Sequence, residues 1–245
     1  MKRIIALLLL LLLLTGCTTA APAATVPATE PTAAPTETVV LPLPTEEPTE
    51  PTEPAREGLT VHFIDVGQAD GFLLECDGEY AIIDGGYPEG GEKMVELGVE
   101  ELELVVGTHM HGDHIGGLPL ILDTYPTETV WSRPITFVND YVRNFRDAVA
   151  RQRIPLHVPE VGEVFELGDA TITVLGPVKD QYEDLNDTSI VLMVQYGDIR
   201  FLFTGDMEMI AETDLLDSGA DVKADVLKVG HHGSYSSTGY RLLRE

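Results

Sequence analysis

Three histidines and an aspartate gather in one short segment of this 245-residue chain. The segment reads THMHGDHIGG, follows an apolar stretch, and contains His109, His111, Asp113 and His114. Imidazole and carboxylate groups are ligands for Zn²⁺ and similar divalent cations. A lone His-x-His pair is weak evidence, because such pairs are also common in cores and on surfaces. Four such groups followed by Gly-Gly, which lets the backbone turn tightly, predict a metal site.

Two later segments have the same character. FLFTGD ends an apolar stretch with Asp206, and KVGHHGS ends another with His231 and His232. Taken singly, a carboxylate after a strand is usually a turn or cap residue, and a pair of histidines is usually a surface feature. Together with the first segment, these residues supply enough ligands for two divalent metal ions.

The stretches that would position these ligands have the patterns of strands and helices. Strand formers bounded by turn residues occur at residues 60–66, 71–76, 79–86, 102–109, 128–133, 170–176, 189–197, 198–206 and 224–230. Helices are predicted at 92–97, from 118, at 138–153 and at 209–217, the third from its apolar period. This order predicts an α/β domain in which two sheets pack face to face with helices outside. Strands that end in loops would then bring the ligands to one cleft.

Five segments in this order, IDVGQAD, AIIDGG, THMHGDHIGG, FLFTGD and KVGHHGS, resemble the metallo-β-lactamase superfamily. More narrowly, they are similar to the C-terminal domain of ComEC-type DNA-uptake (competence) proteins and their stand-alone secreted relatives. The similarity runs from about residue 59 to residue 237. It implies the metallo-β-lactamase fold, an αββα four-layer sandwich. It also implies a metal-dependent hydrolase that activates water and acts on phosphodiesters, as a nuclease does.

The resemblance also implies a role for each ligand. The two metal ions would be held by His109, His111, Asp113, His114, Asp206 and His231. The first two would bind one ion, and Asp113, His114 and His231 would bind the other. Asp206 would bridge the pair.

Other side chains would act around these ligands. Asp84, in AIIDGG, would orient a ligand histidine, although it could also be a simple turn residue. His232 and Ser234 would line the substrate side of the site. Asp113 and Asp206 would be the catalytic carboxylates, with Asp206 as the proton acceptor.

The chain departs from the superfamily pattern at one ligand. The superfamily usually supplies a further histidine before the penultimate strand, where residues 184–189 here read DLNDTS. Asn186, Asp187 or water would fill that place, so the first ion would bind weakly or would be Mn rather than Zn. Ala69 also stands where the family has a glycine, although Asp70 is retained. Because the family continues with a further strand and helix, we expect a domain truncated at the C-terminus.

The N-terminal sequence predicts that the protein is exported from the cytoplasm. Lys2 and Arg3 precede the apolar run 4–14, which is short against the roughly 20 residues of a membrane-spanning helix. This pattern is typical of a secretory signal. LTGC then resembles a bacterial lipobox, so we expect residues 1–16 to be a lipoprotein signal peptide. Cys17 would carry the lipid and anchor the protein in the membrane; the alternative is an ordinary secretory signal.

The composition separates a stalk from a folded domain. Residues 17–57 are mostly Thr, Pro, Ala and Glu, which predicts a disordered stalk. Residues 58–245 would form the hydrolase domain and hold 34 acidic and 12 basic residues, in a chain of net charge −26. Such acidity argues against tight duplex binding, which depends on Lys and Arg. Cys76 lies in an apolar stretch and is expected to be buried without a disulfide.

Three functions are compatible with these features. The first is hydrolysis of an anionic ester such as single-stranded DNA or a small phosphodiester. The second is a β-lactamase or lactonase acting on amides or esters, which the missing third histidine disfavours. The third is a non-catalytic surface binding module stabilised by metal, although a site short of one ligand looks open, as catalytic sites are. No G-x-S-x-G segment supports serine chemistry, and no protein partner is indicated.

Overall fold

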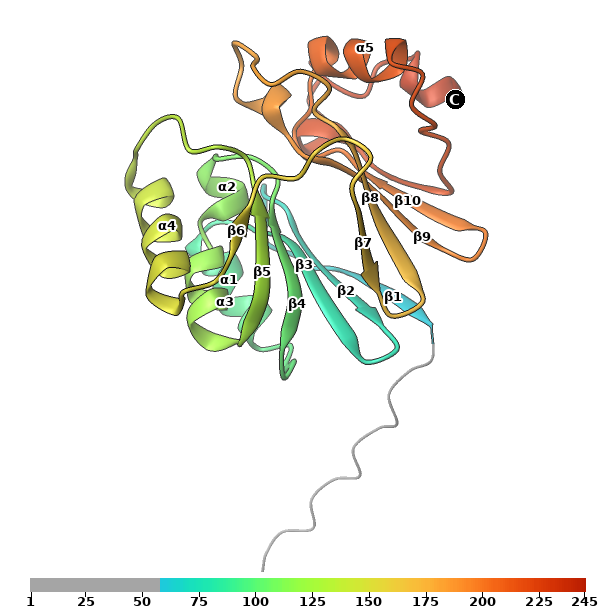
Figure 1. Ribbon diagram of the computed structural model, residues 1–245. Coiled ribbons are helices and arrows are strands. Elements are labelled where there is room, and N and C mark those ends of the chain that lie inside the picture. Colours follow the sequence, from blue (N-terminus) through green and yellow to red (C-terminus); the bar gives the residue numbers. More distant parts are fainter. Residues whose placement is uncertain (1–57) are drawn as a thin grey trace, which may run out of the picture. The chain divides into compact units, whose positions relative to one another are not determined.

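The structure, a computed structural model, describes residues 58–245 (Figure 1). The predicted signal peptide, the stalk and Cys17 lie outside the described residues. Within residues 58–245, no helix has both the length and the apolar character needed to cross a bilayer.

The first half of the domain forms a six-stranded sheet in which the strands follow the order of the chain, β1 to β6. Strands β1, β2 and β3 pair antiparallel, whereas β3 to β6 pair parallel. Parallel neighbours need crossover connections, which are usually helical, and α1 to α4 provide them on one side of the sheet (Figure 1). The elements are β1 (Leu59–Phe63), β2 (Gly71–Cys76), β3 (Glu79–Gly85), α1 (Pro88–Val95), β4 (Leu102–Gly107), α2 (Gly112–Ile115), α3 (Leu118–Thr124), β5 (Thr127–Ser132), α4 (Asp140–Gln152) and β6 (Leu156–His157).

The second half forms a five-stranded sheet of order β11-β10-β9-β8-β7. Strands β7 to β10 pair antiparallel, and β11 returns parallel to β10 through helix α5. The predicted hairpin at Tyr196–Asp198 is present, because Tyr196 pairs with Ile199 across its turn. The elements are β7 (Val164–Leu167), β8 (Ala170–Gly176), η1 (Asn186–Thr188), β9 (Val191–Tyr196), β10 (Ile199–Phe203), α5 (Met209–Asp217), β11 (Val226–Lys228), η2 (Gly230–Gly233) and η3 (Leu242–Arg244).

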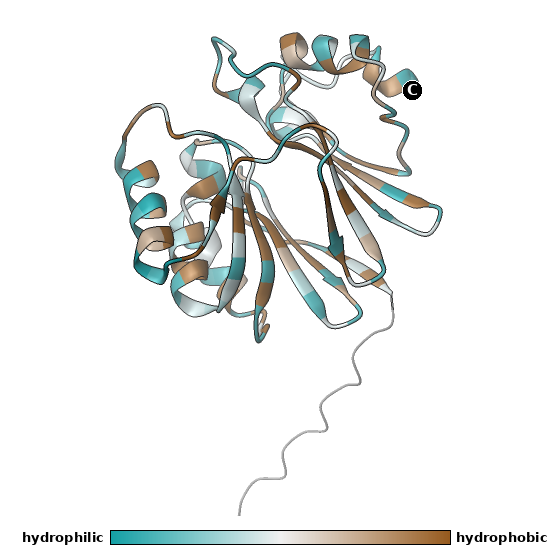
Figure 2. Cartoon of the chain, in the orientation of Figure 1, coloured by the Kyte–Doolittle hydropathy of each residue, from teal (hydrophilic) through white to brown (hydrophobic). Residues whose placement is uncertain are grey.

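Three hydrophobic clusters hold these layers together. Alternate residues of β9 belong to two of these clusters. Leu192 and Val194 pack between the two sheets, whereas Val191 and Met193 pack under α5. The third cluster lies between the first sheet and its helices. Figure 2 accordingly shows hydrophobic and hydrophilic bands along the strands, while hydrophilic residues prevail on α4. Helix, sheet, sheet and helix form the four layers that the sequence predicted.

Most of the predicted elements are present with ends shifted by a few residues. The helix expected at 92–97 begins earlier, at Pro88, a residue that suits the first turn of a helix. Helix α2 and strands β6 and β7 were not predicted. Each of these is short, and β7 exposes alternate residues at the sheet edge, so the apolar pattern is weak. Cys76 is buried, as expected, and is a free cysteine within residues 58–245.

Candidate metal centre

Parallel strand ends bring the predicted site residues to one edge of the sandwich. Strands β3 and β4 are parallel neighbours and lead into Asp84 and the His109–His114 loop. Strands β10 and β11 are likewise parallel and lead into Asp206 and the His231–His232 pair. Parallel strands end at the same edge of a sheet, and small molecules that bind to open α/β sheets lie outside these carboxyl ends.

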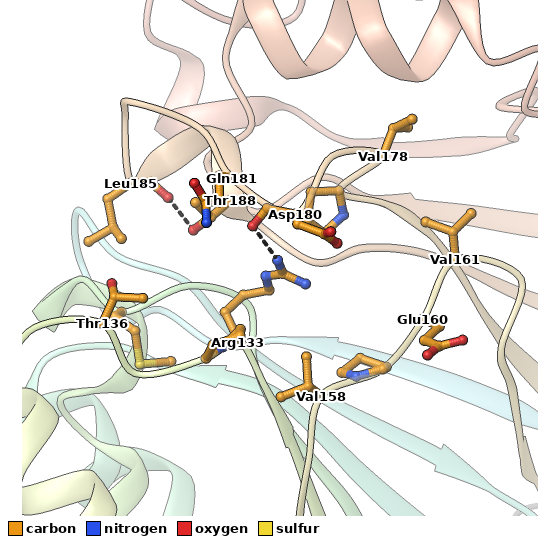
Figure 3. A pocket seen from close by; sticks show the side chains of 14 residues that line it. Arg133, Thr136, Val158, Glu160, Val161, Val178, Asp180, Gln181, Leu185 and Thr188 are labelled. Atoms are coloured by element: carbon orange, nitrogen blue, oxygen red, sulfur yellow. Dashed lines mark hydrogen bonds between the residues drawn. The ribbon is translucent and has the colours of Figure 1, made fainter.

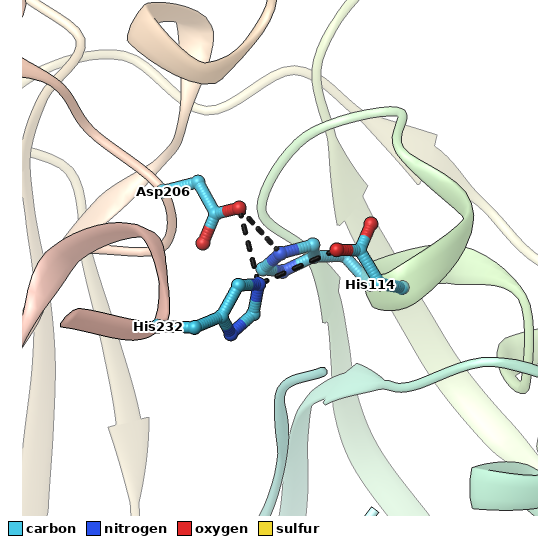
Figure 4. Close-up of side chains that lie close together, drawn as sticks. His114, Asp206 and His232 are labelled. Carbon is cyan, nitrogen blue, oxygen red and sulfur yellow. Dashed lines mark ion pairs between the residues drawn. The ribbon is translucent and has the colours of Figure 1, made fainter. Parts of the chain in front are cut away.

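Four of these side chains form a compact cluster (Figure 4). One ligand atom each from Asp113, His114, Asp206 and His232 lies within 4.8 Å of the others. The Oδ2 atom of Asp206 lies 3.1 Å from Nε2 of His114 and 3.3 Å from Nε2 of His232. The same nitrogen of His232 lies 3.3 Å from Oδ2 of Asp113. One half of the fold supplies Asp113 and His114, and the other supplies Asp206 and His232.

The chemistry of this cluster fits a divalent cation. Nε2 of His114, Nε2 of His232 and Oδ1 of Asp206 are buried and make no hydrogen bond of good geometry among residues 58–245, although the two nitrogens lie 3.1–3.3 Å from carboxylate oxygens. Buried polar atoms without a partner are costly and rare in native proteins. Imidazole nitrogen and carboxylate oxygen are also the donors that Zn²⁺ uses. A cation bound among these atoms would therefore satisfy both the imidazole nitrogens and the carboxylate oxygens.

The charges of the cluster also favour a bound cation. Burial acts to lower the pKa of His114, but the carboxylates of Asp84 and Asp206 raise it to about 10. Contacts with Asp113, Asp206 and Asp70 raise the pKa of His232 to about 11. Burial acts against the charged form of Asp206, yet the two histidines hold its pKa well below the usual range. The surrounding carboxylates thus attract positive charge, which either protons or a metal ion can provide.

His109 and His111 form a second set of donors next to the cluster. Nε2 of His109 lies 3.0 Å from Nδ1 of His111 and 3.9 Å from Oδ2 of Asp206. Complete burial, together with the neighbouring charge of His114, keeps the pKa of His109 well below its ordinary value. His109 is therefore a neutral imidazole, the form that binds metals.

Asp84 contacts one of the candidate ligands directly. Its Oδ2 atom lies 2.7 Å from Nδ1 of His114, so the Nε2 atom of that ring faces the cluster. The same carboxylate accepts hydrogen bonds from the backbone N–H and the hydroxyl of Thr108. Asp84 is completely buried and has a positive φ of 58°. This is the geometry of a carboxylate that fixes a ligand histidine.

The two adjacent histidines lie differently from our expectation. His232, which we expected on the substrate side, belongs to the cluster and has a side chain only 12% exposed. His231, which we expected as a ligand, is 32% exposed; its Nδ1 lies 2.8 Å from Glu208 and its Nε2 lies 3.9 Å from Asp206. Both residues have left-handed backbone angles. The twist of this turn, which the pattern HH does not reveal, decides which ring faces inward.

Asn186 and Asp187, the two residues proposed to replace the missing histidine ligand, also have different roles. Oδ1 of Asp187 accepts the backbone N–H groups of Glu208 and Ala211, so Asp187 caps the start of α5. Asn186 donates from Nδ2 to Glu208, and its buried Oδ1 has no hydrogen-bond partner in the described domain. The oxygen of the Asn186 side chain is therefore free to act as a metal ligand. Ser234 contacts Ser236 at 2.9 Å rather than the cluster.

Lys228 was not singled out from the sequence, yet it lies against the centre. Its side chain is 8% exposed, and Nζ lies 2.5 Å from Oδ2 of Asp70 and 3.6 Å from Oδ1 of Asp206. Nζ also donates to the carbonyl oxygen of Gly205. Asp70 in turn lies 3.3 Å from His232. A lysine within the apolar stretch ADVLKVG, just before the histidine pair, was the available signal.

Comparison with known proteins places this chain in a family. A model of the metallo-beta-lactamase superfamily matches residues 64–245. The chain belongs to this superfamily and has the fold of its metal-dependent hydrolases. Among solved structures, MEM-A1, a subclass B3 metallo-beta-lactamase from a soil metagenome library, shares this fold with a TM-score of 0.50. The match has 15% sequence identity and covers 72% of this chain and 77% of that one.

Curated relatives agree with the narrower resemblance to ComEC-type proteins. ComE operon protein 3 of Bacillus subtilis is 28% identical over 208 residues, which cover 76% of this chain and 27% of that protein. Recombination protein 2 of Haemophilus influenzae is 28% identical over 193 residues, which cover 76% of this chain and 23% of that protein. The matched part of the chain thus spans about a quarter of each relative.

The N-terminus also matches a known signal. A model of the prokaryotic membrane lipoprotein lipid attachment site covers residues 1–18, which include Cys17. This match supports a lipid-anchored, extracytoplasmic protein, as the sequence predicted.

Proposed function

We propose that this chain is a metal-dependent phosphodiesterase that uses two divalent ions, Zn or Mn, outside the cytoplasm. Its substrate would be an anionic ester, either single-stranded DNA or a small phosphodiester. The observation that carries the proposal is the convergence of buried imidazole nitrogens and carboxylate oxygens around Asp206, in contacts that lack good hydrogen-bond geometry. An open centre of this kind is typical of a catalytic metal site rather than a structural one.

The described side chains suggest how two ions would be shared. Asp113, His114 and His232 would hold one ion, and His109 and His111 would hold the other. Asp206, whose Oδ2 lies within 3.9 Å of nitrogens from four histidines, would contact both. In this assignment His232 takes the place first given to His231. The oxygen of Asn186, which makes no hydrogen bond within the described domain, would complete the second set, and an oxygen ligand favours harder cations such as Mn²⁺.

Divalent cations at such a centre lower the pKa of water and neutralise the charge that develops in the transition state. The residues of the chain prepare this chemistry. Asp84 orients His114, and Lys228 holds Asp70 beside His232. The side chain of Asp113 is 22% exposed, whereas that of Asp206 is 1% exposed. Of the two carboxylates proposed to be catalytic, Asp113 is therefore the one that an incoming water or substrate can reach, whereas Asp206 is buried.

Two observations favour a phosphodiester over an amide or lactone. The narrower motif resemblance is to ComEC-type DNA-uptake proteins, and the curated relatives agree with it. The third histidine of the usual superfamily site is also replaced by the Asn186 region. A β-lactamase or lactonase activity remains the second candidate, because MEM-A1 shares the fold. A binding module that keeps metal only for folding is the third.

Metal content and turnover together test the proposal. The metal-loaded chain should hold about two ions and hydrolyse bis(p-nitrophenyl) phosphate faster than the β-lactam nitrocefin. His111→Ala should lose most of this activity. His62→Ala is the matched control, because His62 lies on β1 and contacts Glu75 instead of the centre. Equal activity of the two variants, or faster turnover of nitrocefin, would contradict the assignment, and bound metal without turnover would favour the binding module.

A further inference from the structure

A cavity of about 690 Å³ lies between three loops that come from both halves of the fold (Figure 3). The loops follow β5, β6 and β8, and they contribute Arg133, Val158 and Val178 among the lining residues. The volume is in the range of sites that hold small molecules or cofactors. The cavity is thus large enough to accept a substrate group of nucleoside size.

Some residues that line the cavity are neighbours in the chain of residues of the candidate metal centre. Met110, which lines it, stands in the chain between His109 and His111. Leu185 and Thr188, which also line it, flank the short helix that carries Asn186. A substrate bound at the centre could therefore extend into this cavity.

Arg133 contributes to the cavity a cation that forms no ion pair with another described residue. Its Nη2 donates to the backbone oxygen of Asp180 at 3.3 Å, while its buried Nε has no hydrogen-bond partner among residues 58–245. Its guanidinium forms no ion pair within that range either, although the domain has 34 acidic and 12 basic residues. Burial lowers the pKa of Arg133, and the nearby Asp180 carboxylate acts in the opposite direction. The group remains charged, because arginine ordinarily titrates above pH 12.

The other residues that line the cavity favour the attraction between Arg133 and a bound anion. Val158, Val161 and Val178 add apolar surface to the lining of the same cavity (Figure 3). The two carboxylates of the lining, Glu160 and Asp180, are exposed and so are screened by solvent more than the half-buried Arg133. Arginine is well suited to phosphate because its planar donors match the phosphate oxygens.

We propose that this cavity binds the nucleoside next to the scissile phosphodiester and that Arg133 binds a second phosphate on that nucleoside. The inference rests on the proposed function and narrows its substrate class. The preferred substrates would be phosphodiesters with another phosphate one nucleoside away, such as short single-stranded oligonucleotides. Arg133 would be a specificity residue that does not contact the reacting phosphate.

Binding of two simple nucleotides tests this inference without turnover. Calorimetry on the metal-loaded chain should show thymidine 3′,5′-bisphosphate binding about tenfold more tightly than thymidine 5′-monophosphate, as expected for one charge-assisted contact. Arg133→Gln should bind the two nucleotides equally. Arg143→Gln removes the same charge from an exposed arginine of α4 and should keep the tenfold preference.

The outcomes separate this inference from the proposed function. Equal binding by the native chain, a preference that survives in Arg133→Gln, or no binding of either nucleotide would overturn it. If Arg133→Gln does not fold, Thr136→Glu adds a carboxylate at an exposed lining position and should remove the preference instead. A native chain that shows the preference but does not hydrolyse bis(p-nitrophenyl) phosphate would refute the hydrolase and leave the phosphate site standing.

Discussion

At the scale of single residues, the buried negative charge of Asp206 is balanced by positive groups around it, and a bound cation would take part in that balance. Asp206 is 1% exposed and is surrounded by histidines and by the ammonium of Lys228. Without metal, the positive charge must come from protons on His114 and His232, whose pKa values are raised. Protons and metal ions therefore compete for the same nitrogens.

This competition predicts how the stability of the metal-free protein depends on pH. The folded pKa values of His114 and His232, about 10 and about 11, lie above the ordinary 6.5. Their stabilising contribution is complete below pH 6.5 and is lost as the pH rises through the folded pKa values. We expect the free energy of unfolding in EDTA to fall by at least about 2 kcal/mol between pH 6.5 and 10, since one pKa unit corresponds to about 1.4 kcal/mol.

Urea denaturation at several pH values measures this loss. The depressed pKa of Asp206 contributes stability above about pH 4 and does not change over the same range. The same series with saturating Zn²⁺ is the control, because metal binding requires neutral imidazoles and removes the alkaline loss. A metal-free protein that is equally stable at pH 6.5 and pH 10 would contradict this charge distribution.

The neighbouring histidines give a second prediction at the residue scale. His232→Ala should reduce the metal bound per chain by about one ion, because His232 belongs to the four-residue cluster. His231→Ala should weaken metal affinity by less than about tenfold, since its ring contacts Glu208 at the rim, as outer partners of metal ligands do. Metal analysis after dialysis compares the two variants, and the reverse order would restore His231 as the ligand.

The sequence could predict which residue types meet at the centre but not how each side chain is directed. The histidine-rich loop and the carboxylate of Asp206 follow apolar strands, so strand pairing alone brings them together. The choice between His231 and His232 depends on two left-handed backbone conformations. Arg133 has no motif around it, and its position beside the cavity depends on loops of both halves.

At the scale of elements, close contacts between backbones position the histidine-rich loop. A Cβ atom built on Gly117 would lie 2.1 Å from the carbonyl oxygen of Gly85 at the end of β3 and 2.6 Å from the backbone nitrogen of Gly91 in α1. The loop can therefore approach β3 and α1 only without a side chain at this position. The second glycine of the pair that ends THMHGDHIGG is explained by this packing.

Gly117→Ala should destabilise the domain and disturb the centre together. Overpacking usually costs about 1–3 kcal/mol, and here we expect the upper end, because both clashing groups are backbone atoms. Glu92→Ala, at an exposed position of α1, should change stability by less than about 0.5 kcal/mol. Thermal unfolding with and without metal compares the variants, and an unaffected Gly117→Ala protein would show that α1 and α3 can move apart.

The elements that the sequence predicted best are those with a clear period. The strands of the second sheet alternate between the intersheet core and the face under α5, and α4 carries a regular apolar stripe. The pattern was weak in β6 and β7, whose residues are mostly exposed, and in the single turn of α2. Those elements depend on tertiary pairing and not on local sequence.

At the scale of the whole molecule, the charge of the domain is opposite to that of most nucleic-acid binding proteins. Residues 58–245 carry 34 acidic and 12 basic residues. Among the residues that line the cavity, Arg133 is the one basic side chain. A strand of DNA would therefore be held by the centre and the cavity, and would be repelled by the remaining surface.

This arrangement predicts a weak and unusual dependence on salt. A protein that neutralises many phosphates loses about 10³–10⁵ in affinity between 50 and 200 mM salt, whereas one phosphate contact on a single strand gives a change of only about threefold. Salt also screens the repulsion between the acidic surface and DNA over about 10 Å. We therefore expect the KM for a single-stranded oligonucleotide to change by less than about threefold over this range, or to fall. Steady-state assays at fixed metal concentration measure it, with bis(p-nitrophenyl) phosphate as the control substrate, and a KM that rises a hundredfold would mean that a basic surface contacts the strand after all.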